Sequence, residues 1–183
     1  MKYFFVSDIH GYFDQLIDAL NKAGFDRENP EHTLVSCGDH FDRGPKPVEV
    51  MDYIMSLPRK VLVRGNHEDL MVNCCKREFA FNSDRLNGTA ATIDDLATEF
   101  IKRLPNNDYR LTNNQYQLAL QIAEPFLAEL RDYYETERHI FVHAWIPVLE
   151  SSDVPIRRKQ DTHIFRHPDW RNASKEDWAV PDG

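Results

Sequence analysis

Several polar side chains of the sequence are of the types that bind divalent metal ions, and they stand directly after apolar segments. The candidate ligands are two carboxylates, two imidazoles and one amide, namely Asp8, His10, Asp39, His143 and Asn66. Oxygen and nitrogen ligands mixed in this way suit manganese, iron, zinc or cobalt, and they suit calcium poorly. Because the set contains no thiolate, it also argues against a closed structural zinc site.

Five ligands exceed the three that one catalytic metal ion typically uses, so a carboxylate shared between two ions would use them economically. Two ions about 3.5–4 Å apart can stabilise the attacking and leaving oxygens of an in-line phosphoryl displacement. Three further residues could serve such a reaction. Arg43 offers a planar guanidinium to phosphate oxygens. His67 could protonate a leaving alkoxide if a carboxylate such as Asp42 fixes its tautomer.

The elements that must position these residues alternate along the first part of the chain. Residues 2–7, 32–37 and 60–64 are short and apolar, which predicts strands, and residues 13–25 and 48–57 have the periodicity of amphipathic helices. This order predicts a largely parallel α/β sheet, in which ligands bind beyond the carboxyl ends of the strands. The polar segments should therefore meet at one edge of the sheet.

The middle of the chain has a different pattern. Residues 70–130 show helical periodicity and no convincing strand, and Pro125 is expected to kink or end a helix there. Residues 131–145 then predict a hairpin whose second strand, 139–142, leads directly to His143. From residue 146 onward the sequence is polar, and no periodicity assigns its structure.

Composition limits the class of protein. The 183 residues are 42% hydrophobic, which suits one domain with a sizeable core. Thirty acidic residues against 22 basic ones give a net charge of −8, which disfavours nucleic acid as a partner but still admits an anionic substrate beside a metal ion. The early apolar run is too short for a signal peptide or a membrane span. We expect a cytoplasmic protein whose cysteines, Cys37, Cys74 and Cys75, are reduced and structural.

Four motifs, at residues 8–11 (DIHG), 38–44 (GDHFDRG), 65–68 (GNHE) and 142–145 (VHAW), occur in a characteristic order. In these motifs the chain resembles the phosphoprotein phosphatase branch of the calcineurin-like metallophosphoesterases, in its bacterial or phage-like form, over residues 2–147. The resemblance implies an α/β fold in which a β-sandwich is flanked by helices, in α/β/β/α layers. It also implies a mainly helical insertion in the middle and a single domain over residues 1–183.

Carried over position by position, the resemblance implies two divalent ions, with manganese expected ahead of iron, zinc or cobalt. One ion would be bound by Asp8, His10 and Asp39, and the second by Asp39, Asn66 and His143. A hydroxide that bridges the two ions would attack phosphorus in line.

The resemblance also assigns the remaining chemistry. His67 would be the general acid, paired with Asp42, and Arg43 would bind the substrate phosphate. The other polar residues of the motifs receive structural roles: His40 is expected to pack or to support the ligands. Glu68 is expected to be a favourable charge in the first turn of a helix.

The chain departs from the family near its end. Members usually carry a further metal-ligand histidine in a Gly-His motif and a second phosphate-binding arginine, whereas this sequence has no Gly-His pair. His163 and His167 imitate that motif, but the neighbouring segment 169–178 resembles one that precedes it in related phosphatases. We therefore do not count His167 as a ligand and expect the C-terminal part of the domain to be missing.

The resemblance implies a metal-dependent phosphomonoesterase that acts on phosphoserine or phosphothreonine in proteins or on a small phosphomonoester. Two alternatives stay open. One is a hydrolase of dinucleoside polyphosphates or phosphodiesters, whose two-metal core would be the same. The other is a binding module that keeps the fold without a working second metal ion. Neither nucleic acid nor a membrane is expected as a partner.

Overall fold

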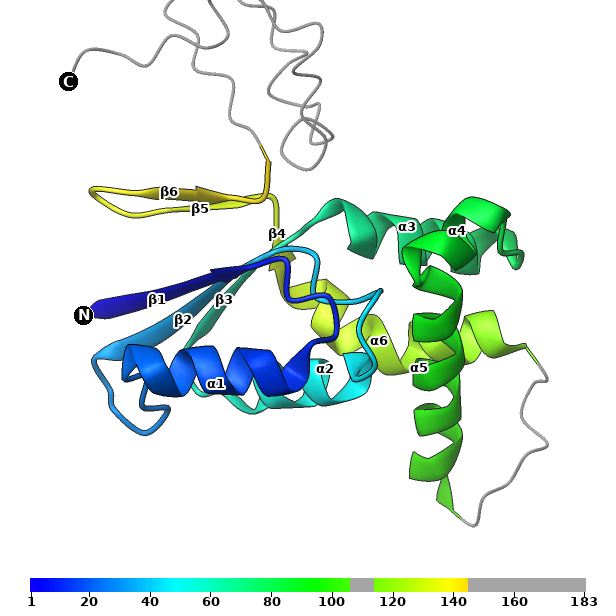
Figure 1. The fold of residues 1–183 in the computed structure, drawn as a ribbon, viewed down its shortest axis with the longest axis horizontal. Helices are drawn as coiled ribbons and strands as arrows, with labels where there is room; N and C mark the ends of the chain where they lie inside the picture. Colours follow the sequence, from blue (N-terminus) through cyan, green and yellow to red (C-terminus); the bar gives the residue numbers. More distant parts are fainter. Residues whose placement is uncertain (106–113, 145–183) are drawn as a thin grey trace, which may run out of the picture.

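A four-stranded parallel sheet forms the centre of the protein (Figure 1). The computed structural model describes residues 1–105 and 114–144 of the chain. The strands lie in the order in which they occur along the chain: β1 (Lys2–Ser7), β2 (His32–Cys37), β3 (Lys60–Val63) and β4 (Leu130–Arg131). The first three confirm the strands predicted from the sequence. The fourth was not predicted, because two residues are too few to show a periodic pattern.

The register of the sheet separates two apolar faces. Phe4 pairs with Leu34 and Val35 pairs with Val61, and successive side chains of a strand point to opposite faces. Phe4 and Leu34 accordingly belong to the large core shared with the helices, whereas Val35 and Val63 form a smaller core on the other face. Both faces of the sheet are therefore used for packing.

Two helices connect the first three strands and cover one face of the sheet (Figure 1). Helix α1 (Phe13–Ala23) buries Leu16 and Leu20, and it ends at Gly24 in the left-handed conformation that glycine adopts without steric cost. Helix α2 (Pro47–Ser56) begins with proline in its first turn, where the missing N–H is not needed. Both helices confirm the sequence prediction.

The middle of the chain is helical, as predicted: α3 (Asn66–Arg77), α4 (Asn82–Asn87), α5 (Thr89–Arg103) and α6 (Gln115–Glu129). Helix α6 does not end at Pro125 but continues to Glu129. Proline removes one helical hydrogen bond, and the buried side chains of Ala123 and Phe126 on either side anchor the helix in the core despite this loss. None of the helices among the described residues is long and apolar enough to cross a membrane.

A β-hairpin made of β5 (Tyr133–Glu135) and β6 (Ile140–Val142) covers the second face of the sheet and confirms the predicted hairpin. The ring of Tyr3 on β1 lies 6.2 Å from that of Tyr134 and 6.1 Å from that of Phe141. The described residues thus contain three of the four expected layers, namely helices, sheet and second sheet. This packing matters for the site because His143 directly follows β6.

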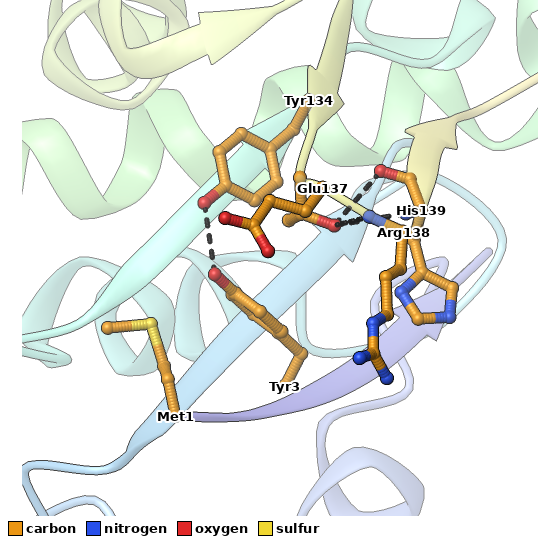
Figure 2. Close-up of a pocket in the computed structure, with 7 residues that line it drawn as sticks. Met1, Tyr3, Tyr134, Glu137, Arg138 and His139 are labelled. Atoms are coloured by element: carbon orange, nitrogen blue, oxygen red, sulfur yellow. Dashed lines mark hydrogen bonds between the residues drawn. The ribbon is translucent and has the colours of Figure 1, made fainter.

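A hollow of about 510 Å³ lies between the beginning of β1 and the turn of the hairpin (Figure 2). Its lining includes Met1, Tyr3, Tyr134 and residues 136–139, and the two tyrosine hydroxyl oxygens are 3.4 Å apart. In a parallel α/β sheet the ligand site is expected at the carboxyl ends of the strands. This hollow lies at the opposite end of the sheet, where β1 begins, and it therefore does not coincide with the expected ligand site.

The reactivity of the three cysteines offers a test of how the helices pack on the sheet. Cys37, Cys74 and Cys75 are buried and free of disulfide bonds, and burial raises the pKa of Cys37 and of Cys75 to about 12. We expect none of them to react with Ellman's reagent in the native protein at mildly alkaline pH. All three should react after unfolding in guanidinium chloride. Rapid labelling of any one of them in the native protein would contradict the packing.

Candidate functional site

The polar segments meet at the carboxyl ends of the strands, as predicted. The structure brings together all eight side chains that the sequence singles out: Asp8, His10, Asp39, Asp42, Arg43, Asn66, His67 and His143. They come from the loops after β1 and β2, from the start of α3 after β3, and from the residue after β6. Within residues 1–105 and 114–144, one edge of the fold therefore carries the candidate ligands together with the candidate acid.

The carboxylate of Asp39 stands at the centre of this group. Its Oδ2 is 3.6 Å from Nε2 of His10, and its Oδ1 is 3.4 Å from Nε2 of His143. The amide oxygen of Asn66 lies 3.1 Å from the same His143 nitrogen. Oδ2 thus faces His10, with Nε2 of His67 at 3.8 Å, while Oδ1 faces His143, as a carboxylate shared between two ions would require.

Backbone carbonyls fix the tautomers of the two imidazoles. Nδ1 of His10 is 2.9 Å from the carbonyl oxygen of Phe41, and Nδ1 of His143 is 2.8 Å from that of Cys37. Because a carbonyl can only accept a hydrogen bond, both Nδ1 atoms must carry the proton. Each Nε2 atom then faces Asp39 and, in the neutral imidazole, carries the lone pair that a metal ion would take, which is the arrangement that proteins use to orient histidine ligands of metals.

The charge of Asp39 also favours a bound cation. Burial and the negative charge of the neighbouring Glu68 raise the pKa of this carboxyl group. Keeping Asp39 ionised in such a place requires a compensating positive charge nearby. Divalent metal ions with nitrogen and oxygen ligands would supply it, so the residues present fit the ions that the sequence predicts.

The grouping of possible ligands differs in detail from the expected one. Their ligand atoms fall into two sets, each within 4.8 Å: His10 with Asp39 and His67, and Asp8 with Asp39 and His143. The resemblance places Asp8 beside His10 and leaves His67 outside both ligand sets. Asp39 belongs to both groups in either arrangement.

His67 has a second set of contacts that suits an acid. Its Nδ1 donates to Oδ2 of Asp42 at 2.7 Å, and its Nε2 lies 3.2 Å from Nη2 of Arg43. Burial opposes the charged form of His67, but the hydrogen bond to Asp42 and the charge of Asp39 outweigh it and raise the pKa of His67. The raised pKa makes the imidazolium form of His67 easier to reach than in a free histidine, and its Nε2, which faces Arg43, is directed to the site.

The loops that carry these residues have an unusual backbone. Among the described non-glycine residues, six have positive φ, and five of these belong to the site: Asp8, His10, Asp39, Asp42 and Arg43. Such conformations cost about 1–3 kcal/mol each and persist only where the surroundings impose them. Here the first two loops are held together by backbone hydrogen bonds, from His10 N–H to the Asp39 carbonyl at 2.8 Å and from Gly44 N–H to the His10 carbonyl at 2.7 Å.

Glu68 is a site residue whose role the sequence analysis missed. It was expected to be a first-turn helix charge, yet it is fully buried and joins two loops. Its carboxylate accepts from the backbone N–H groups of Asp39 at 3.1 Å, His40 at 2.8 Å and Gly65 at 2.7 Å, and His40 Nδ1 lies 3.1 Å away. Burial alone would raise the pKa of Glu68, but His40 and the backbone donors lower it to about 2.

One signal in the sequence could have revealed this role. Glu68 shares its helix face with Met71 and Cys75, at spacings of three and seven residues, and both of those are buried. The supporting role predicted for His40 is confirmed, since it is fully buried and its Nε2 lies 2.8 Å from the hydroxyl of Ser36. The segment that contains His163 and His167 lies outside the described residues.

A family profile and two curated relatives match parts of the chain. The family profile "Calcineurin-like phosphoesterase" matches residues 1–178. The asymmetrical bis(5'-nucleosyl)-tetraphosphatase of Bacillus velezensis is 37% identical over 106 residues, which cover 53% of this chain and 43% of that protein. The symmetrical bis(5'-nucleosyl)-tetraphosphatase of Buchnera aphidicola is 41% identical over 69 residues, which cover 37% of this chain and 24% of that protein.

The fold also resembles a solved structure. A crystal structure of a candidate diadenosine tetraphosphatase superposes with a TM-score of 0.50 at 20% identity, covering 85% of this chain and 54% of that one. At this identity the likeness concerns the fold alone. The matches to the two curated relatives span less than half the length of each.

The contacts of Glu68 predict a large effect of a small change. In Glu68→Gln one oxygen becomes an NH₂ group that faces backbone donors, so the free energy of unfolding should fall by about 3 kcal/mol. Urea unfolding followed by circular dichroism measures this, with Glu124→Gln, an exposed position on α6, as the matched control. Equal stability of the two variants would contradict the role of Glu68.

The pH dependence of stability gives a second test of the same residue. The folded-state pKa of Glu68, about 2, lies below the ordinary value of 4.5. Its ionised form therefore stabilises the parent protein fully above pH 4.5, and this contribution is lost as the pH falls toward 2. The difference in stability between the parent protein and Glu68→Gln should shrink over that range.

Proposed function

The chain belongs to the calcineurin-like phosphoesterase family, and from that premise we propose that it is a metal-dependent hydrolase of dinucleoside polyphosphates. The observation that carries the proposal is the carboxylate of Asp39, whose two oxygens face two imidazoles of fixed tautomer. Polyphosphate hydrolysis is the activity in the names of the two curated relatives above. They favour the alternative raised by the sequence over a phosphoprotein phosphatase.

In this proposal Asp39 would help to hold two divalent ions. Asp8 and His10 would be the further ligands of one ion, and Asn66 and His143 those of the other. Mixed carboxylate, amide and imidazole ligands suit manganese, iron, zinc or cobalt, and manganese is expected ahead of the others from the resemblance to the family. When bound, such ions supply Lewis-acid activation of water and neutralise the charge of the phosphate chain.

The remaining residues act on the substrate. Arg43 binds an oxygen of the phosphoryl group through charge-assisted hydrogen bonds, which orients that group for in-line attack. His67, held by Asp42, gives its Nε2 proton to the leaving oxygen. For a protein with a net charge of −8, these local positive groups are what admit a polyanionic substrate.

Substrate comparison tests the proposal. The protein should hydrolyse diadenosine tetraphosphate in the presence of manganese, faster than it hydrolyses a phosphoserine peptide, and a chelator should abolish the activity. Chromatography of the products separates symmetrical cleavage, which gives two nucleoside diphosphates, from asymmetrical cleavage, which gives a mono- and a triphosphate. Hydrolysis of the phosphopeptide but not of diadenosine tetraphosphate would instead support a phosphoprotein phosphatase. If the protein binds metal but hydrolyses neither substrate, a binding module would be favoured.

Metal titration tests the shared carboxylate. Asp39→Asn should weaken the binding of both ions, and by more than the about 10–100-fold that loss of an outer-shell partner typically costs. Asp8→Asn should mainly weaken one ion and Asn66→Ala the other. Calorimetric titration with manganese measures this, with Asp94→Asn, an exposed carboxylate on α5, as control and circular dichroism to verify the fold. Unchanged binding of two ions by Asp39→Asn would refute the sharing.

A further inference from the structure

We propose that Thr89 and Thr92, at the start of α5, are positioning residues that clamp Asp42 and so aim His67 at the leaving group. The inference rests on the proposed function, because it gives His67 the role of acid. It assigns a task in catalysis to the helical middle of the chain, where the sequence shows no motif for one.

The two hydroxyl groups together bind both carboxylate oxygens of Asp42. Oγ1 of Thr89 donates to Oδ2 of Asp42 at 2.6 Å, and Oγ1 of Thr92 donates to Oδ1 at 2.8 Å. Oδ2 also accepts from Nδ1 of His67 at 2.7 Å. With both oxygens engaged, the carboxylate cannot rotate freely, and the plane in which it holds the imidazole is fixed.

The same helix holds the backbone of the loop. Oγ1 of Thr92 accepts from the backbone N–H of Asp42 at 3.0 Å, so this threonine binds both the main chain and the side chain of one residue. Asp42 and Arg43 have φ angles of 72° and 63°, a strained conformation that needs such support. Gly88, just before Thr89, packs so closely that a Cβ there would lie 2.3 Å from the backbone nitrogen of Arg43.

A threonine at the start of a helix usually has a simpler task. Its hydroxyl commonly satisfies a free N–H of its own first turn. In α5 the N-cap is Gly88 and no side chain caps the helix. The hydroxyls of Thr89 and Thr92 are instead buried against Asp42, together with His67. Their orientation thus serves the loop rather than the helix.

If Thr89 and Thr92 position His67 through Asp42, their loss should affect catalysis in a way that a merely structural role would not. A misaimed acid slows reactions with a poor leaving group more than reactions with a good one, because only the former need full protonation. Thr89→Val and Thr92→Val keep the shape of the side chain and remove the hydroxyl group. Thr89→Ser and Thr92→Ser keep the hydroxyl group and remove a methyl group.

The kinetic experiment compares phenyl phosphate with p-nitrophenyl phosphate, whose leaving phenol is the stronger acid, both with manganese. Each valine variant should lose about 5- to 50-fold in kcat on phenyl phosphate, less than the ~10²–10⁴-fold contribution of a whole acid, with little change in KM. The loss on p-nitrophenyl phosphate should be smaller, and the serine variants should recover most of the rate. Thr98→Val, an exposed threonine of α5, is the matched control and His67→Asn the reference.

A second measurement does not depend on activity. In the metal-free protein, the Nδ1 proton of His67 should give a downfield NMR signal, assigned by its absence in His67→Asn. Thr89→Val and Thr92→Val should shift this signal and speed its exchange with water, while Thr98→Val should leave it unchanged.

Two results would contradict the proposed positioning role of Thr89 and Thr92. One is valine variants that match Thr98→Val in the NMR signal. The other is an equal loss on both phosphates without recovery by serine. If the parent protein hydrolyses nothing, the proposed function fails, but the NMR signal still decides the clamp.

Discussion

A single buried negative charge organises the site. The carboxylate of Glu68 lies entirely within the protein and accepts hydrogen bonds from two separate loops, those that follow β2 and β3. An ion in such a place is tolerated only when its lone pairs are satisfied, so the two loops must keep the relative position that satisfies them. Glu68 also fixes the backbone of Asp39 directly, because it accepts a hydrogen bond from the Asp39 N–H group.

The rest of the arrangement follows from that fixed point. The parallel sheet delivers Asp8 and His10 beside Asp39, and backbone hydrogen bonds join their loops. His143 reaches the site from the other face of the sheet, at the end of the hairpin. The hairpin is held there by the packing of Tyr134 and Phe141 against the ring of Tyr3 on β1. Helix α5 then holds Asp42 and its strained loop. Residues of five segments, namely the loops after β1 and β2, α3, the hairpin and α5, thus meet in one place.

Sequence reasoning works well where a residue follows the end of a regular element. Asp8, Asp39 and Asn66 each come after a strand with a clear apolar pattern, so the topology of the sheet alone predicts that they converge. It fails where the function of a residue depends on packing between elements that no local pattern relates. In the sequence, Glu68 looks like any acidic residue in the first turn of a helix. Thr89 is the first residue of an ordinary amphipathic helix, and only the three-dimensional fold turns its hydroxyl toward the site.

The proposed function depends most on Asp39, which would help to hold two metal ions, one on the side of His10 and the other on the side of His143. Anomalous diffraction from crystals soaked in manganese tests this most directly, because the signal locates the ions without reference to activity. We predict two peaks, one beside Oδ2 of Asp39 toward His10 and one beside Oδ1 toward His143. A single peak, or two peaks that do not both contact Asp39, would contradict the account.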